Sequence, residues 1–502
     1  MSQHGTAMDS PTATLADPRT ADNVVYDPTL SELREFAREK ETTTEYGSPS
    51  YVSEHQSRNA DLTENALDAE FGAADYAHVR SALDAAADRE MVCLDRKLGR
   101  HPENSYVCRY YVPKEFSRIA LSWAKLLEPA PEDAEPDFTT VQVPDADEVA
   151  IRVLPDEGFT AVLGTDYSGE AKKSFLRLFM LDAKRQGGLG LHAGTKRVRL
   201  ESDDGELETV GQVFLGLSGT GKSTLTAHGL GLEPPEDATM LQDDVCALRP
   251  DGTVAGSEGE GLYIKTIGLG PDEQPAMYEA ATHESAVLEN VDVAADGTVD
   301  FDSDAHTSNA RGIVQREHLP SADEDIDLGS IDQVFFITRN PAMPSIAKLS
   351  PEEAAVAFML GESVQTSAGD PDKAGEAIRV VGTNPFIIGS EGEEGNRFRD
   401  LISDLDVEAY LLNTGTVGGR DIGADDTVTL LREVSRGCIE WADDATTGLT
   451  VPDSVPELDV SRFDVADALD DADEQLSDLR EEREEYLDEF DDLDESIRSA
   501  VY

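Results

Sequence analysis

Lysine and cysteine are both scarce in this chain of 502 residues. Basic residues number 41 against 103 acidic ones, which gives a formal net charge of −62, and only 12 of the basic residues are lysines. This balance argues against a general affinity for nucleic acids or for anionic membrane surfaces. The four cysteines, Cys93, Cys108, Cys246 and Cys438, lack the spacing of a metal site, and such a small, scattered set is typical of a reducing compartment.

Long apolar runs are missing as well. No stretch approaches the ~18 apolar residues that a membrane span requires, and the polar segment Met1–Pro28 contains no apolar signal core. We therefore expect a cytoplasmic protein with no membrane partner. Hydrophobic residues still make up 39% of the chain, so a chain of this length can bury a sizeable core and wholesale disorder is not expected.

The acidic residues are spread along the whole chain. Such a surface repels itself in dilute buffer, and only concentrated salt screens it, with a Debye length of about 3 Å at 1 M. We interpret the composition as halophilic, as in proteins from a high-salt cytoplasm. The alternative interpretation is an ordinary acidic protein with a solvated face.

The distribution of apolar residues predicts an α/β fold. Residues 1–28 are rich in Ser, Thr, Asp and Pro, and we expect them to be disordered. The middle third alternates strands, glycine turns and helices, and residues 212–217 and 333–338 are the clearest buried strands.

The acidic tail, Val465–Ala500, has apolar residues at steps of three and four, interrupted only by Arg483. This spacing predicts an amphipathic helix with an acidic outer face. Two interpretations remain open: a coiled coil that dimerises or binds a partner, and a helix packed on its own domain.

The most specific motif is a glycine-rich loop, Gly216–Ser223, which fits the pattern G-x-x-x-x-G-K-[ST] between an apolar strand and a helix. Glycines allow backbone N–H groups to surround phosphate oxygens, and the helix N-terminus adds partial positive charge. Lys222 is expected to contact the outer phosphates, and the Ser223 hydroxyl to ligate Mg²⁺. The expected nucleotide-binding residues of this segment are Gly216, Leu217, Ser218, Gly219, Thr220, Gly221, Lys222, Ser223 and Thr224.

A second polar group surrounds this loop in the sequence. Asp243 and Asp244 follow a short apolar element about twenty residues after the loop, where a second strand would end in metal-binding carboxylates. Upstream stand the paired lysines Lys172 and Lys173, and then His192. The alternatives are a solvated acid pair, a solvated lysine pair and a core histidine.

Together, these motifs resemble the ATP-dependent phosphoenolpyruvate carboxykinases. That family has Tyr-x-Gly-Glu-x-Lys-Lys, a short gap to a His, Gly-Leu-Ser-Gly-Thr-Gly-Lys-Thr and then Asp-Asp. The resemblance covers about Met91–Leu431. It includes Tyr263-Ile-Lys-Thr266, Leu288-Glu-Asn-Val291, Asp296-Gly-Thr-Val-Asp-Phe301, Thr307-Ser-Asn-Ala-Arg311, Leu412-Asn-Thr-Gly415 and Gly99-Arg100-His-Pro-Glu-Asn-Ser-Tyr106. The chain departs from the family at Val245-Cys246, where Glu-His is usual, at Gly259-Glu260-Gly261 and at Ser223, where Thr is usual. The spacing from Arg420 to Thr427 is one residue longer than in the family.

The resemblance implies the reaction oxaloacetate + ATP → phosphoenolpyruvate + ADP + CO₂, a step of gluconeogenesis. It also implies two α/β lobes, one of them a P-loop nucleotide-binding domain, with the active site in the cleft between them. The expected division is a disordered segment 1–28, a substrate lobe 29–195, a nucleotide-binding lobe 196–455 and the acidic helical tail 456–502. The chain is expected to be a monomer or a homodimer, with the tail as one dimerising element.

The resemblance also assigns roles to residues. The Mn²⁺ and Mg²⁺ ligands would be Lys173, His192, Asp243, Asp244 and Ser223. Oxaloacetate would be bound by Arg100 and Tyr167. The charge of the transferred phosphate would be neutralised by Lys172, Lys222, Lys265 and Arg311, and the nucleotide would also contact Arg311, Arg420 and Thr427.

Two other functions remain open. One is another P-loop phosphotransferase, similar to the histidine-carrier-protein kinases, which would explain the loop and Asp243–Asp244 but not the upstream lysines and His192. The other is a non-catalytic ATP-binding regulator acting through its acidic tail. An assay for phosphoenolpyruvate separates both from the carboxykinase.

Overall fold

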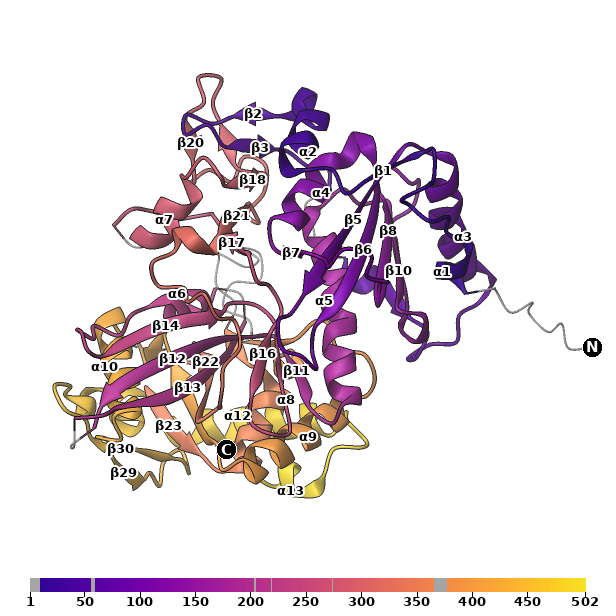
Figure 1. Ribbon diagram of the computed structural model, residues 1–502. Helices are drawn as coiled ribbons and strands as arrows, with labels where there is room; N and C mark the ends of the chain where they lie inside the picture. The colour runs from indigo at the N-terminus through magenta and orange to yellow at the C-terminus, as the bar shows by residue number, and fades with distance from the viewer. Residues whose placement is uncertain (1–9, 56–58, 203–204, 218, 273, 365–376) are drawn as a thin grey trace, which may run out of the picture. The chain divides into compact units, whose positions relative to one another are not determined.

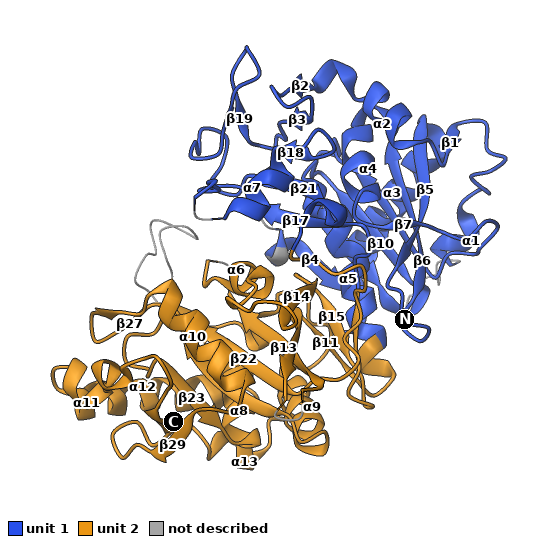
Figure 2. Cartoon of the chain, turned by 60° about the vertical axis from the view of Figure 1, so that its left-hand side comes forward, with its two compact units in different colours: residues 1–182, 257–320 blue, residues 183–256, 321–502 orange. Residues whose placement is uncertain are grey.

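The computed structural model describes residues 10–55, 59–202, 205–217, 219–272, 274–364 and 377–502. The chain forms two compact units, coloured separately in Figure 2. Unit 1 comprises Met1–Asp182 and Ser257–Pro320, and unit 2 comprises Ala183–Gly256 and Ser321–Tyr502. The chain thus passes from one unit to the other at three points.

Unit 1 contains an eight-stranded mixed sheet in the order β1-β5-β6-β8-β10-β9-β4, with β7 paired to β5 (Figure 1). Helix α3 (Ala73–Asp88) buries Val79, Ala82 and Leu83 in the same core as inward residues of β8 and β10. The strands of this sheet are β1 (Val24–Tyr26), β4 (Thr63–Asn65), β5 (Met91–Leu98), β6 (Tyr106–Pro113), β7 (Glu128–Pro129), β8 (Phe138–Val143), β9 (Ala150–Leu154) and β10 (Phe159–Leu163).

A second sheet of unit 1, in the order β17-β21-β18-β3-β2, joins the two segments of the unit. Its strands are β2 (Thr42–Thr43), β3 (Pro49–Tyr51), β17 (Gly261–Lys265), β18 (Val287–Glu289) and β21 (Arg311–Gln315). The remaining elements of unit 1 are α1 (Pro11–Thr14), α2 (Leu30–Phe36), α4 (Ser117–Ala124), α7 (Pro275–Ala281), β19 (Asp292–Val293) and β20 (Val299–Asp300), and α5 (Ser168–Arg185) runs from unit 1 into unit 2.

Unit 2 is built on an eight-stranded sheet in the order β14-β12-β13-β22-β26-β23-β30-β29. Strand β22 alternates between two cores, because successive side chains of a strand point to opposite faces: Val334 and Phe336 face one, Phe335 and Ile337 the other. The first core contains residues of α8, α9 and the tail, and the second contains residues of α6 and α10. The strands are β12 (Ala193–Glu201), β13 (Leu207–Gly216), β14 (Asp237–Gln242), β22 (Gln333–Thr338), β23 (Ile346–Leu349), β26 (Glu408–Asn413), β29 (Glu440–Asp443) and β30 (Thr450–Ser454).

Smaller elements complete unit 2. The short strands are β11 (Leu189–Leu191), β15 (Cys246–Leu248), β16 (Val254–Gly256), β24 (Ser363–Val364), β25 (Ala377–Ile378), β27 (Thr416–Val417) and β28 (Arg420–Asp421), and the helices are α6 (Lys222–Ala227), α8 (Pro351–Leu360), α9 (Glu391–Asp404), α10 (Ala424–Ser435), α11 (Val465–Ala468), α12 (Ala472–Leu487) and α13 (Glu495–Arg498). The mixed α/β fold is confirmed. None of the described helices is both long and apolar enough to cross a membrane.

Three expectations differ from the structure. Residues 10–28, expected to be disordered, include α1 and β1, and β1 pairs with β5 in parallel. The tail is not one helix: turns separate α11, α12 and α13, because Leu493 and Ile497 fold back to join the same core as Leu487. This packing favours the interpretation of a tail that covers its own unit.

The division of the chain also differs from the expected lobes at 195/196. Strands β17, β21 and β18 place Ser257–Pro320 in unit 1, because β18 pairs with β3. The first boundary falls within α5, at Asp182. The long sequence separation between β3 and β18 leaves no local signal for this pairing.

Candidate active site

The sheet of unit 2 brings several polar segments to one edge. Strands β13, β22 and β26 are parallel, and β12 runs antiparallel to both β13 and β14. The carboxyl ends of β13, β14, β22 and β26 therefore meet at the same edge, as does the amino end of β12. In open α/β sheets, ligands bind outside the carboxyl ends of the strands.

The glycine-rich loop leaves this edge after β13 and enters α6. Gly219 and Gly221 have φ values of +87° and +99°, in the left-handed region that glycine adopts without strain. A Cβ on Gly216 would lie 2.6 Å from the Thr220 hydroxyl, so the turn requires glycine there. The Thr414 hydroxyl, just after β26, donates to the backbone oxygen of Thr220 (2.8 Å) and ties the loop to the sheet.

Of the loop residues predicted from the sequence, Ser218 lies outside the described residues. Lys222 is buried at the first position of α6, while Ser223 and Thr224 are exposed. The N-terminus of α6 thus has backbone N–H groups and a lysine in one place, an arrangement that favours anions.

The predicted acid pair lies beside this loop. Asp243 and Asp244 directly follow β14, and the Ser223 hydroxyl donates to Asp243 Oδ2 (3.2 Å). Asp244 Oδ1 lies 3.0 Å from Nε2 of His192, the residue before β12. The structure therefore brings Ser223, Asp243, Asp244 and His192 together within unit 2.

The surroundings of His192 constrain its protons. Its Nδ1 lies 2.6 Å from the backbone oxygen of Thr383 and its Nε2 lies 3.0 Å from Asp244 Oδ1, and because both oxygens only accept, either ring nitrogen can be the donor. Burial and the nearby charge of Lys222 lower the pKa of His192, although Asp244 opposes this. A cation bound between Nε2 and Asp244 would take the Nε2 lone pair and leave the ring proton on Nδ1, facing the backbone oxygen of Thr383.

This donor set fits a divalent metal such as Mn²⁺ or Mg²⁺, which accept carboxylate and hydroxyl oxygens, with imidazole suited to the transition metals. Among the described residues, however, no group of three or more His, Cys, Asp or Glu side chains is placed to hold a metal ion. His192 and Asp244 alone form a pair, so a site here needs further ligands of other types.

Unit 1 contains the paired lysines, on the first turns of α5. The Lys172 ammonium lies 2.7 Å from Glu258 Oε2, and both side chains are buried. The Lys173 ammonium contacts Glu170 Oε1 one turn earlier on α5. Burial lowers the pKa of Lys173, while Glu170 and Tyr167 oppose this. A solvated lysine pair, one alternative from the sequence, is therefore wrong.

An aromatic side chain lies near two cations of unit 1. The ring centroid of Tyr263 is 5.5 Å from the Lys172 ammonium and 5.4 Å from the guanidinium carbon of Arg311, within the range of cation–π attraction. The Tyr263 hydroxyl donates to Glu289 Oε2 (2.8 Å). Burial and Glu289 raise the pKa of Tyr263, which keeps the hydroxyl protonated as a donor.

The other predicted residues of unit 1 have polar partners. The Tyr167 hydroxyl accepts from Asn309 Nδ2 (3.3 Å), and Arg311 Nη2 donates to Asn309 Oδ1 (2.8 Å). Lys265 pairs in register with Arg311 across β17 and β21. Arg100, just after β5, donates from Nε to Glu128 Oε1 (2.6 Å) and from Nη2 to the backbone oxygen of Gly259 (3.1 Å).

Arg420 and Thr427 contact only backbone atoms in the hydrogen bonds of their side chains that the structure gives. Arg420 Nη1 donates to the backbone oxygen of Arg462 (2.9 Å). The Thr427 hydroxyl, buried on α10, donates to the backbone oxygen of Gly423 (3.1 Å). Their roles at the nucleotide stay predictions.

Sequence reasoning missed Glu258, Glu289 and Thr383. Glu258 carries no signal of its own in a chain with 103 acidic residues. Thr383 acts through its backbone oxygen, which any residue type supplies. Glu289 and Asn309 lie inside segments that resemble the family, Leu288–Val291 and Thr307–Arg311, but the sequence analysis gave neither residue a role.

A glycine-rich loop beside an acid pair, in a chain that also buries a lysine pair, is typical of enzymes that handle a nucleotide and a metal. Comparison with known proteins is more specific. A family model described as phosphoenolpyruvate carboxykinase matches residues 37–461, and the chain belongs to this family, in its ATP-dependent form.

Relatives named phosphoenolpyruvate carboxykinase (ATP) support this assignment. The protein from Aeropyrum pernix is 39% identical over 346 residues, which cover 68% of this chain and 69% of the relative. The protein from Salinibacter ruber, named phosphoenolpyruvate carboxykinase (ATP) 1, is 30% identical over 352 residues, 65% of this chain and 62% of the relative. One from a Chelativorans species is 33% identical over 316 residues, 60% of this chain and 55% of the relative.

Proposed function

We propose that the protein converts oxaloacetate and ATP into phosphoenolpyruvate, ADP and CO₂, and serves gluconeogenesis. The observation that carries this proposal is the family match over residues 37–461. The convergence of the glycine-rich loop, Asp243, Asp244 and His192 at one sheet edge of unit 2 supports it. A kinase of the histidine-carrier-protein type would leave the lysine pair and Arg311 unexplained.

The nucleotide is held by the loop Gly216–Ser223, a P-loop. Its backbone N–H groups and the N-terminus of α6 bind the phosphates, and Lys222 neutralises the transferring group. Ser223 and Asp243, already in contact (3.2 Å), are suited to hold Mg²⁺ with the outer phosphate oxygens. Arg420 and Thr427 are proposed to contact the nucleoside.

The oxaloacetate end is handled by cations of unit 1. Arg100 and Tyr167 bind the substrate, and Lys172, Lys265 and Arg311 balance charge on the enolate and on the phosphate. Glu258 and Tyr263 hold the Lys172 ammonium in place. Because loss of CO₂ leaves an electron-rich enolate, fixed positive charge favours decarboxylation without a proton transfer.

Lys173, His192 and Asp244 are proposed as ligands of Mn²⁺, which when bound would polarise the carbonyl oxygen of oxaloacetate. Thr383 keeps the proton of His192 on Nδ1, so that Nε2 offers its lone pair. Lys173 must be neutral to act as a ligand, and its burial favours that form. That two lobes enclose the reaction stays a prediction.

The test is the appearance of phosphoenolpyruvate from oxaloacetate, ATP, Mg²⁺ and Mn²⁺ in molar KCl. Lys222→Ala should reduce turnover at least a thousandfold, because the transferring phosphate loses its main counter-charge. The matched control is Lys348→Ala, which should remain active. Lys348 lies on β23 of the same unit, where it forms an ion pair with Glu408 of β26. Undiminished turnover of Lys222→Ala at saturating ATP would contradict the role of this loop.

We further propose a cytoplasmic, halophilic enzyme. The basis is the net charge of −62 on an accessible surface of 20,956 Å². The protein acts on small molecules as a monomer or a homodimer. The apolar side of the tail packs on unit 2, so a dimer would form through another surface.

A further inference from the structure

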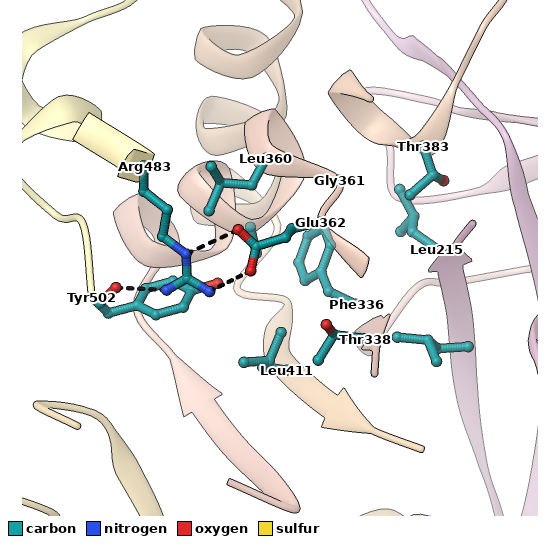
Figure 3. Close-up of a pocket in the computed structure, with 12 residues that line it drawn as sticks. Leu215, Phe336, Thr338, Leu360, Gly361, Glu362, Thr383, Leu411, Arg483 and Tyr502 are labelled. Carbon is teal, nitrogen blue, oxygen red and sulfur yellow. Dashed lines mark hydrogen bonds and ion pairs between the residues drawn. The ribbon is translucent and has the colours of Figure 1, made fainter. Parts of the chain in front are cut away.

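The acidic tail contains one buried cation, Arg483 on α12. Figure 3 shows its guanidinium between Glu362 and Tyr502. Arg483 donates from Nη2 to Glu362 Oε1 (2.8 Å), from Nε to Glu362 Oε2 (3.2 Å) and from Nη1 to the backbone oxygen of Tyr502 (2.6 Å). This is the residue that interrupts the apolar spacing of the tail.

Glu362 receives two further hydrogen bonds. Asn340 Nδ2 donates to its Oε1 (2.9 Å) and Arg379 Nε to its Oε2 (3.1 Å). Both carboxylate oxygens are thus bound from two sides. A bidentate, buried arginine–carboxylate pair fixes orientation more strictly than a surface pair.

Glu362 lies two residues after the end of α8, where the backbone meets the segment that carries Thr383. A Cβ on Gly361 would lie 1.8 Å from the backbone oxygen of Val380, so the two backbones are in close contact. Val380 N donates to the backbone oxygen of Leu360 (3.2 Å), and Ser363 pairs with Ile378. The end of α8 and residues 378–380 are therefore in direct backbone contact, so a shift of Glu362 would be transmitted to the segment that carries Thr383.

Thr383 is held in a conformation that it does not favour. Its φ is +52°, following Gly382 at +58°, and a β-branched residue in this region is an outlier. Such a residue persists only when its surroundings hold it. Its N–H donates to the backbone oxygen of Val380 (2.7 Å), and its own backbone oxygen contacts Nδ1 of His192 (2.6 Å).

We propose that Arg483 is a positioning residue: through Glu362 and the end of α8 it holds the backbone oxygen of Thr383 against Nδ1 of His192. The tail thereby fixes the ring orientation and the tautomer of a residue at the candidate metal site. Contacts to the second nitrogen of a ligating histidine commonly change metal affinity by 10- to 100-fold. This inference rests on the proposed function only in that His192 binds Mn²⁺.

A small cavity beside this cluster is lined by Leu360, Glu362, Thr383 and Arg483 (Figure 3). Its volume of about 20 Å³ is close to what a single water requires. The cavity gives the end of α8 room to shift once Arg483 is removed. Loss of the Arg483 guanidinium should therefore displace the backbone of Thr383.

The test compares Arg483→Met with Arg483→Lys and with Arg480→Met, which removes an exposed arginine from the same helix. The ¹⁵N chemical shifts of His192 report the tautomer in the protein without metal, and titrations with Mn²⁺ and with ATP–Mg²⁺ report the two affinities. Arg483→Met should give a mixture of tautomers and about a tenfold weaker affinity for Mn²⁺, with ATP–Mg²⁺ affinity within twofold. Arg483→Lys should recover part of both losses, and Arg480→Met should match the wild type.

Among the described residues, Arg483→Met leaves the buried Glu362 with only Arg379 and Asn340 as partners. If this variant unfolds, the double variant Arg483→Met/Glu362→Gln, which removes both charges, takes its place in the same measurements. An unchanged tautomer and Mn²⁺ affinity within twofold would overturn the proposal. So would an equal loss in Arg480→Met, or a parallel fall of both affinities, which would indicate general loosening. If the wild type itself fails to bind Mn²⁺, the proposed metal role of His192 is wrong, while the tautomer still decides whether Arg483 positions the ring.

Discussion

Lys196 gives the sharpest test of the energetics around the glycine-rich loop. It lies on β12 with no exposed surface, and its ammonium donates to the backbone oxygens of Leu225 and His228 (2.7 Å to the latter), at the end of α6. Burial lowers the pKa of Lys196 from 10.5 to about 7. The replacement Lys196→Met removes the ionising group and keeps an unbranched chain.

The sign of the pH dependence of stability follows from the number of protons that the folded and unfolded chains bind. The folded pKa lies below the unfolded value, so between pH 7 and 10.5 the unfolded chain binds the additional proton and the free energy of unfolding rises with pH. With these two pKa values, the contribution of Lys196 changes by about 2.5 kcal/mol between pH 7.5 and 9.5. Lys196→Met lacks this change. Its stability relative to the wild type should therefore be lower at pH 9.5 than at pH 7.5 by that amount.

Urea unfolding at constant KCl measures this difference. Trp441 is on β29 of unit 2, whereas Trp123 is on α4 of unit 1, so a Trp123→Phe background gives fluorescence from unit 2 alone. Lys348→Met corrects for the loss of one positive charge. A gap between Lys196→Met and the wild type that stays the same at both pH values would refute the reasoning, and would mean that the two backbone oxygens keep Lys196 charged.

Three other predictions address the site, the tail and the surface. Lys173→Arg should weaken Mn²⁺ affinity and phosphoenolpyruvate formation at least tenfold, because arginine stays protonated and cannot ligate a metal. Its ATP–Mg²⁺ affinity, measured by calorimetry, should stay within twofold of the wild type. A normal Mn²⁺ dependence would exclude Lys173 as a ligand. Burial raises the pKa of Glu362, but Arg483 opposes this effect and helps to hold that pKa at about 2, below the usual 4.5. The ionised Glu362 carboxylate therefore stabilises the fold above pH 4.5, and this contribution is lost as the pH falls towards 2. The gap in urea stability between wild type and Glu362→Gln should shrink by about 2 kcal/mol from pH 7 to 3, and a constant gap would contradict the shifted pKa. The 103 acidic residues share 20,956 Å² of surface, about one per 200 Å². A Debye length of about 30 Å at 0.01 M salt spans many of these charges, whereas one of about 3 Å at 1 M spans none. The melting temperature should therefore rise with the KCl concentration, and a flat or falling series would exclude the halophilic interpretation.

The parts of the molecule that could be predicted from the sequence are those with a local cause. Residues 333–338 form β22 as predicted, because an uninterrupted apolar run between turn residues fits a strand buried on both faces. The loop Gly216–Ser223 follows β13 and leads into α6, as predicted. Both the glycine spacing and the start of the helix depend only on neighbouring residues, so a local pattern identifies them.

The parts that could not be predicted depend on partners distant in the sequence. Glu258 reaches Lys172 across 86 positions, and among so many acids no pattern marks it. The apolar spacing of residues 465–500 predicted one helix, but burial of Leu493 and Ile497 against α8 outweighs the continuation of α12. Arg483 looked like an interruption of that spacing, and its partner Glu362 is known only from the fold.

The three passages of the chain between the units have a consequence for synthesis on the ribosome. Ser50 of β3 pairs with Leu288 of β18, and translation at roughly 5–20 residues per second separates these two residues by on the order of ten to fifty seconds. During that interval the β18 side of β3 exposes unpaired backbone groups, as at any open sheet edge. The nascent chain also completes β12, β13 and α6 before the second sheet of unit 1 can close. Unit 1 is therefore completed only after the glycine-rich loop Gly216–Ser223 has left the ribosome. A nascent chain halted before β18 should present β3 to chaperones that bind extended segments.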